Sequence, residues 1–189
     1  FAIDDELLRP YFQLERVVAG VFKAAKKLFG ITFHQRTDID LYHGDVQTYE
    51  VKDENGKHLA VFYADFFPRA GKRQGAWMTS FRSQKVVDNI DQRPHVSIVC
   101  NFTKPTGTKP SLLTFNEVTT LFHEFGHALH GMLAAGTYSS LSGTDSLSFE
   151  EIKSLLTKMN PDHNAVDKLG TLMNTVFSSY QSDEESLGL

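Results

Sequence analysis

The chain has 189 residues, of which 41% are hydrophobic and 22% are charged, a composition typical of a folded globular protein. Its 19 Lys and Arg residues against 23 Asp and Glu residues give a formal net charge of −4, which argues against nucleic acid or an anionic membrane surface as a partner. A single cysteine excludes a disulfide within the chain, and no apolar run has the length of a membrane span, so cytoplasm is the expected compartment.

The first predicted element is a helix over residues 7–29. Apolar residues recur through this stretch at helical spacing. Gly30, placed directly after a turn that contains Lys26 and Lys27, is typical of a helix end. We interpret the segment as a packing helix that buries its apolar face in the core.

Two strands are predicted next, over residues 46–51 and 59–64. The Asn55-Gly56 pair between them is a strong signal for a hairpin turn. The second strand is apolar on both faces and is expected to be covered on both. The first strand is more polar, which favours a position at the edge of the sheet.

A basic loop follows over residues 68–75, and two interpretations of it stay open. Its basic residues are Arg69, Lys72 and Arg73. The loop either holds the carboxylate of a substrate or is a solvated turn.

After the loop, apolar residues including Met78 and Phe81 are expected in the core. A further strand is predicted over residues 96–102, in which Cys100 is expected to be a buried thiol rather than a nucleophile.

The most specific chemical signal is a His-Glu-x-x-His motif inside a helix predicted over residues 114–135, which a Thr-x-x-Glu capping box opens. His123 and His127 lie four residues apart, so on a helix they share one face and can bind the same Zn²⁺. Glu124 projects beside them, where it can act as a general base on zinc-bound water.

The alternative interpretation of this motif is a core helix whose histidines are merely satisfied polar groups. Burying three ionisable side chains among bulky apolar residues is costly unless a metal satisfies them, which favours zinc. Leu133 stands where the metzincin pattern requires a third histidine, so a carboxylate from a later helix is expected to complete a His₂Glu site. The candidates are Glu150 and Glu151, at the start of a helix predicted to end before Pro161.

Several segments besides the motif occur in the order and with the residues of a known peptidase family. Together they resemble the oligopeptidase A, thimet oligopeptidase and peptidyl-dipeptidase family of zinc metallopeptidases. The resemblance covers residues 8–144 almost continuously. The main matching segments are Leu28-Phe29-Gly30-Ile31, Gly71-Lys72-Arg73-Gln74-Gly75-Ala76-Trp77-Met78, Val99-Cys100-Asn101-Phe102-Thr103-Lys104-Pro105, Leu121 to His130, and Leu141-Ser142-Gly143-Thr144.

The resemblance implies that His123 and His127 bind zinc and that Glu124 activates the water. It also implies that the third ligand is the Glu of an Asp-Phe-Val-Glu segment, which corresponds here to Ser148-Phe149-Glu150-Glu151. Glu151 is the aligned ligand and Glu150 the alternative. After Thr144 the chain departs from the family pattern, and the part that carries the family's oxyanion-stabilising Tyr and His is missing.

We therefore expect an α+β fold that is mostly helical, with a zincin-like active-site helix and a small antiparallel sheet, as a fragment of a larger helical peptidase. One domain is expected over residues 1–189. It comprises a family-like part, residues 8–144, and a divergent helical tail, residues 145–189, with a last helix at about 163–180.

The expected function is that of a zinc-dependent endopeptidase or peptidyl-dipeptidase that hydrolyses short peptides. One alternative is a truncated, non-catalytic fragment that keeps zinc as a structural staple, and another is an α+β domain without a metal. Short peptides are the expected partners, and the sequence carries no signal for an oligomeric state.

Overall fold

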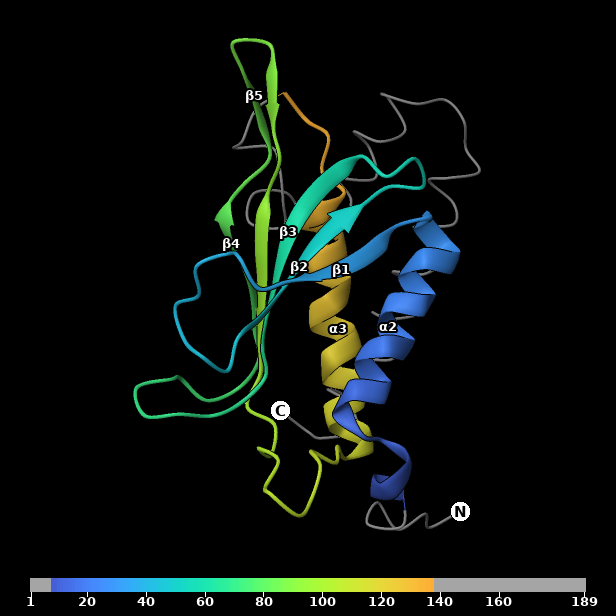
Figure 1. Cartoon of the computed structure of the whole chain (residues 1–189), viewed down its shortest axis with the longest axis vertical. Coiled ribbons are helices and arrows are strands. Elements are labelled where there is room, and N and C mark those ends of the chain that lie inside the picture. The colour runs from blue at the N-terminus through green and yellow to red at the C-terminus, as the bar shows by residue number, and fades with distance from the viewer. Residues whose placement is uncertain (1–7, 138–189) are drawn as a thin grey trace, which may run out of the picture. The chain divides into compact units, whose positions relative to one another are not determined.

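The computed structural model describes residues 8–137, in which two α-helices lie against one face of a five-stranded sheet (Figure 1). The tail helices predicted after residue 147 and the division at residue 144 lie outside these described residues. The described elements are η1 (Arg9–Tyr11), α2 (Leu14–Phe29), β1 (Thr32–Arg36), β2 (Gln47–Lys52), β3 (His58–Asp65), β4 (Trp77–Arg82), β5 (Lys85–Val87), β6 (Ile90–Gln92), β7 (His95–Val99) and α3 (Phe115–Met132).

The sheet is mixed rather than antiparallel. Its strand order is β1-β2-β3-β7-β4, in which β3 and β7 run parallel and every other neighbouring pair is antiparallel. Strands β5 and β6 form a separate two-stranded hairpin that projects beyond the sheet (Figure 1).

The expectation of a mostly helical fold with a small antiparallel sheet is wrong for the part of the chain that the structure describes. Helix and strand take about equal shares of it. Two strands of the five-stranded sheet were not predicted, and neither was the β5–β6 hairpin. Strand β1 has the partly polar sequence Thr-Phe-His-Gln-Arg, and β4 carries Phe81, which was expected in the core but is 56% exposed. The parallel pairing of β3 with β7 joins distant segments, and hydrophobic periodicity does not report such pairings.

The first predicted helix begins later than expected but ends as expected. A 3₁₀ turn containing Pro10 precedes it, and Gln13 at the N-cap is extended, so α2 starts at Leu14. At the other end, Gly30 adopts a φ of 71°, a left-handed conformation that glycine reaches without strain, and its N–H bonds the carbonyl oxygen of Lys26.

The hairpin predicted around Asn55-Gly56 is confirmed. Strands β2 and β3 are antiparallel, and Gly56 has a φ of 79° in the turn between them. Asp53 fixes this turn, because its carboxylate accepts hydrogen bonds from the backbone N–H groups of Asn55 and Lys57. Strand β3 is largely buried, as predicted. Strand β2 is not an edge strand, since β1 covers its outer side.

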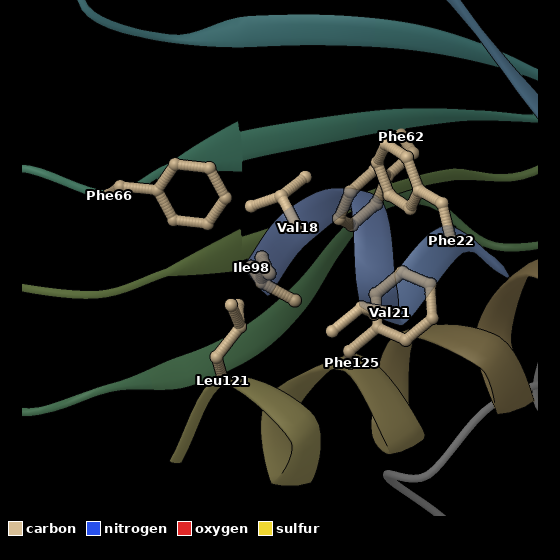
Figure 2. A pocket seen from close by; sticks show the side chains of 8 residues that line it. All are labelled: Val18, Val21, Phe22, Phe62, Phe66, Ile98, Leu121 and Phe125. Atoms are coloured by element: carbon tan, nitrogen blue, oxygen red, sulfur yellow. The ribbon is translucent and has the colours of Figure 1, made fainter. Parts of the chain in front are cut away.

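The core between the helices and the sheet is built on aromatic side chains. Phe22 of α2 and Phe125 of α3 both pack against Phe62 of β3, with ring centroids 6.2 and 5.6 Å from that of Phe62 (Figure 2). The gap left among these side chains has a volume of about 10 Å³ and an entirely apolar lining, so it is a packing void rather than a ligand site. Neither α2 nor α3, the two helices of the described chain, has the combination of length and hydropathy that crossing a bilayer requires.

Candidate metal centre

Helix α3 begins with the capping box that the sequence predicts. The Thr114 hydroxyl accepts a hydrogen bond from the Glu117 backbone N–H at 3.1 Å, and the Glu117 carboxylate accepts one from the Thr114 backbone N–H at 2.8 Å. The helix ends at Met132, three residues earlier than predicted, with Leu133 as its C-cap. The motif therefore lies in the middle of the helix, where the backbone is fixed by its own hydrogen bonds.

The structure brings His123 and His127 together on one face of α3. Their Nε2 atoms are 3.1 Å apart, and the two rings are nearly perpendicular, at 88°. Two nitrogens that bind one Zn²⁺ at 2.0–2.1 Å with a tetrahedral angle are about 3.3–3.4 Å apart. The observed separation is close to that value, so the pair fits a shared metal ion with only a small movement of the rings.

Burial keeps both imidazoles in the form that binds metal. It lowers the pKa of His123, and the neighbouring His127 lowers it further. Burial also lowers the pKa of His127, where His130 adds to the effect. Metal binding requires the neutral imidazole, so a lowered pKa favours a metal-binding histidine at neutral pH.

Glu124 is the buried carboxylate of the motif, with 8% of its surface exposed. Burial raises its pKa, and the nearby backbone of Met78 on β4 opposes this effect. A carboxylate whose pKa is raised toward neutrality is better suited to accept and return a proton than an exposed one. The sequence placed Met78 in the core and did not connect it with Glu124.

The third predicted ligand is not tested by the structure, because Glu150 and Glu151 lie outside the described residues. Within residues 8–137, no group of three or more His, Cys, Asp and Glu side chains is arranged to hold a metal ion. The two histidines are therefore the described part of the site, and Glu151 stays a prediction as the ligand that completes it.

Comparison with models of known protein families shows to which family the chain belongs. The model of peptidase family M3 matches residues 1–162. The chain belongs to this family. The match confirms the family predicted from the sequence and runs past Thr144, where the predicted resemblance ends.

Relatives within family M3 include peptidases from bacteria and plants. The chain is 48% identical over 146 residues to the dipeptidyl carboxypeptidase of Salmonella typhimurium. This match covers 77% of the chain and 21% of the relative. It is 41% identical over 154 residues to the oligopeptidase A of the same organism, a match that covers 81% of the chain and 23% of that relative. The probable cytosolic oligopeptidase A of Arabidopsis thaliana is 40% identical to the chain over 159 residues, and the match covers 81% of the chain and 23% of that relative. The chain thus spans less than a quarter of the length of these curated relatives.

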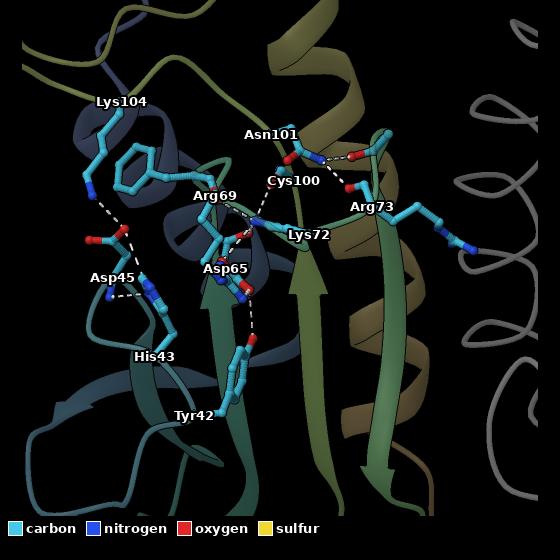
Figure 3. A network of polar contacts seen from close by, with 12 residues as sticks. Tyr42, His43, Asp45, Asp65, Arg69, Lys72, Arg73, Cys100, Asn101 and Lys104 are labelled. Carbon is cyan, nitrogen blue, oxygen red and sulfur yellow. Dashed lines mark hydrogen bonds and ion pairs between the residues drawn. The ribbon is translucent and has the colours of Figure 1, made fainter.

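The basic loop of this M3 chain is mostly exposed, as expected for a solvated turn, but two of its basic side chains are engaged by the protein itself. The Lys72 side chain is 3% exposed and is not solvated. Its ammonium donates to the Asp65 carboxylate at 2.9 Å and to the carbonyl oxygens of Phe67 and Cys100 (Figure 3). Arg69 binds the same carboxylate through two hydrogen bonds of 2.7 and 2.8 Å. Two of the three basic residues therefore hold the loop to the sheet.

Asp65, which sequence reasoning missed, is the anion at the centre of this network. It is 1% exposed at the end of β3. Burial alone would raise its pKa, but hydrogen bonds from Arg69 and Lys72 outweigh burial and hold the pKa below its ordinary value. A charged residue directly after a buried apolar strand was the available signal, because such a charge requires a partner.

Cys100 is fully buried, as predicted, and lies directly after β7. Burial is the main cause that raises the pKa of its thiol, to about 12. The thiol is therefore protonated at neutral pH and is not a nucleophile.

Proposed function

We propose that this chain carries the zinc-binding helix of a peptidase that hydrolyses short peptides. The observation that carries the proposal is the 3.1 Å separation of the His123 and His127 Nε2 atoms on one helix face, with the buried carboxylate of Glu124 beside them. Membership of peptidase family M3 supports the reaction class. The names of two relatives, dipeptidyl carboxypeptidase and oligopeptidase A, support peptides as substrates.

In this proposal His123, His127 and Glu151 hold the zinc. Zinc, when bound, supplies the Lewis acidity that polarises a scissile carbonyl and acidifies water. Glu124 accepts the proton of the attacking water at its carboxylate and then donates that proton to the leaving amine.

The names of the relatives indicate two modes of cleavage. One is removal of dipeptides from the C-terminus, and the other is cleavage within an oligopeptide. We propose the common class, hydrolysis of short peptides, with zinc as the cofactor. The plant relative is named as probably cytosolic, which supports the cytoplasmic location predicted from the sequence.

The experiment that tests this function combines zinc analysis with peptide hydrolysis. The protein is loaded with zinc, its metal content is measured, and internally quenched peptides of about ten residues are offered. Cleavage that disappears in Glu124→Gln while zinc is retained supports the proposal. If the chain binds zinc but shows no cleavage that is lost in Glu124→Gln, the result would instead favour zinc as a structural staple.

A further inference from the structure

The C-terminal end of helix α3 is held by an arginine that comes directly after strand β6. The Arg93 side chain is 11% exposed, and its Nη2 atom donates to the carbonyl oxygen of Met132 at 3.0 Å. Met132 is the last residue of α3, and the last carbonyl groups of a helix have no partner within it. The guanidinium therefore satisfies such a carbonyl and places a positive charge at the negative end of the helix dipole.

The same arginine is itself fixed to the sheet. Its Nε atom donates to the carbonyl oxygen of Leu59 on β3 at 2.7 Å, and its Nη1 atom lies 3.2 Å from the Asp91 carboxylate. Arg82, the last residue of β4, donates two hydrogen bonds of 2.9 and 2.7 Å to the carbonyl oxygen of Arg93. Because several of its donors are occupied at once, the planar guanidinium has little freedom to turn. Arg93 thus joins the end of α3 to both β3 and β4.

A buried glutamine fixes the chain where it leaves α3. The Gln84 side chain is 2% exposed, accepts a hydrogen bond from the Gly136 backbone N–H at 2.8 Å, and donates one to the Asp91 carboxylate at 2.9 Å. The same carboxylate lies beside the Arg93 guanidinium. Gln84 and Arg93 are therefore parts of one polar network, which reaches both the helix end and the segment after it.

The β5–β6 hairpin supplies the frame of this network. Asp88 and Asn89 have φ angles of 50° and 62°, the left-handed conformation that a two-residue type I′ turn requires at both positions. The N–H of Val86 on β5 points away from β6 and donates to the Thr137 carbonyl oxygen at 3.1 Å. Figure 1 shows the segment after α3, in orange, beside this hairpin. We call residues 84–93 the hairpin clamp.

The histidine pair is connected to the clamped end through the helix itself. In an α-helix each carbonyl oxygen accepts from the N–H four residues later, so Gly131 bonds to His127, and His127 bonds to His123. Gly131 is buried against β7, where an added Cβ would lie 3.2 Å from the Val96 Cγ2 atom. The last turn therefore packs directly on the sheet, and opening of this turn frees the backbone of His127.

We propose that Arg93 is a positioning residue for the histidine pair, and that the hairpin clamp keeps the last turn of α3 helical. His123 and His127 can share one metal ion only while the helix holds their Nε2 atoms on one face. The consequence for zinc rests on the function proposed above, whereas the consequence for the helix end does not.

Two substitutions release the hairpin clamp at different points. Arg93→Met keeps the stem of the side chain but removes every donor, and Gln84→Met removes the contact with Gly136 while Arg93 stays in place. Arg36→Met is the control for the lost charge, because Arg36 binds two carboxylates on β1, at the opposite edge of the sheet from β4. Lys72→Met is the control for stability, because it breaks a buried ion pair at the opposite end of β7.

The first measurement is amide hydrogen exchange by NMR on the full, metal-free chain. Arg93→Met and Gln84→Met should each raise the exchange rate of the Gly131 amide about tenfold, because the last turn opens locally more often. Arg36→Met and Lys72→Met should leave this rate unchanged. An unchanged rate in both clamp variants, or an equal rise in Lys72→Met, would overturn the proposal. If Arg93→Met does not fold, Gln84→Met decides by the same criteria.

The second measurement is zinc affinity, by competition with a chromophoric chelator at pH 7 on folded protein. Arg93→Met should weaken zinc binding about tenfold, the lower end of the range for groups that orient metal ligands, and both controls should stay within about twofold of wild type. A merely structural role of Arg93 would make Arg93→Met and Lys72→Met lose affinity alike. That result, or wild-type affinity in Arg93→Met, would overturn the role of Arg93 in the site. If wild type takes up no zinc, the proposed function fails, and the exchange rates alone decide the role of the hairpin clamp.

Discussion

The backbone of Met78 on strand β4 lies close to the carboxylate of Glu124 on helix α3 and opposes the rise that burial causes in the pKa of Glu124. The candidate metal centre is therefore built by two elements that are far apart in the sequence. The helix supplies His123, Glu124 and His127, and the strand borders Glu124. Predictions about the site consequently concern both the helix and the sheet.

Glu124→Gln should keep the zinc and lose the hydrolysis. The amide replaces the carboxylate with nearly the same shape but does not accept a proton at neutral pH, and a general base contributes about 10²–10⁴-fold to the rate. Peptide cleavage and zinc content are measured on the same preparations. Glu54→Gln, an exposed glutamate in the β2–β3 turn, serves as the control and should match wild type. Equal activity in Glu124→Gln and wild type would remove Glu124 from the mechanism.

Lys72→Met should destabilise the protein by about 3–5 kcal/mol, the typical result of breaking a buried ion pair from one side. The reason is that Asp65, which is 1% exposed, loses a cation that also bonds three carbonyl oxygens. Urea unfolding measures the change in the free energy of unfolding. Lys104→Met is the matched control, because Lys104 binds Asp45 at 54% exposure and should cost about 1 kcal/mol or less. Similar losses in the two variants would contradict the buried role of Lys72.

The stability of the protein should fall with acid in a way that depends on Asp65. The pKa of Asp65 is lower in the folded chain than its ordinary value, so folding favours its charged form. This contribution is fully present above the unfolded pKa of about 4, and it is lost as the pH falls through the folded pKa. Urea unfolding from pH 7 downward should show a shallower acid decline in Asp65→Asn than in wild type. Parallel curves for the two proteins would show that Asp65 does not contribute to the decline.

The chemically specific part of the site was predictable because it depends on local patterns. The spacing of His123 and His127 places them on one helix face, and the capping box at Thr114 marks where that helix begins. The hairpin at Gly56 follows from the same kind of short-range signal. Each of these features is encoded within a few neighbouring residues.

The sheet and the support of the site depend on contacts between distant segments. The pairing of β3 with β7 gives no periodic signal, and without β1 the sequence placed β2 at an edge. Asn101 carries an ordinary polar side chain, and only the fold places its amide beside the carbonyl oxygens of Arg73 and Gly75. Lys72 pairs with Asp65 because the fold brings the end of β3 beside the loop, a contact that the sequence alone does not indicate.

The measurement that tests the central claim most directly is the zinc stoichiometry of wild type and of single histidine variants. The chain is loaded with Zn²⁺ and dialysed against a weak chelator, and its metal content is measured by mass spectrometry. We predict one zinc per chain in wild type and in the control His34→Ala, whose histidine is exposed on β1. We predict none in His123→Ala or His127→Ala. Zinc retained by both of these variants, or none taken up by wild type, would contradict a zinc site on α3.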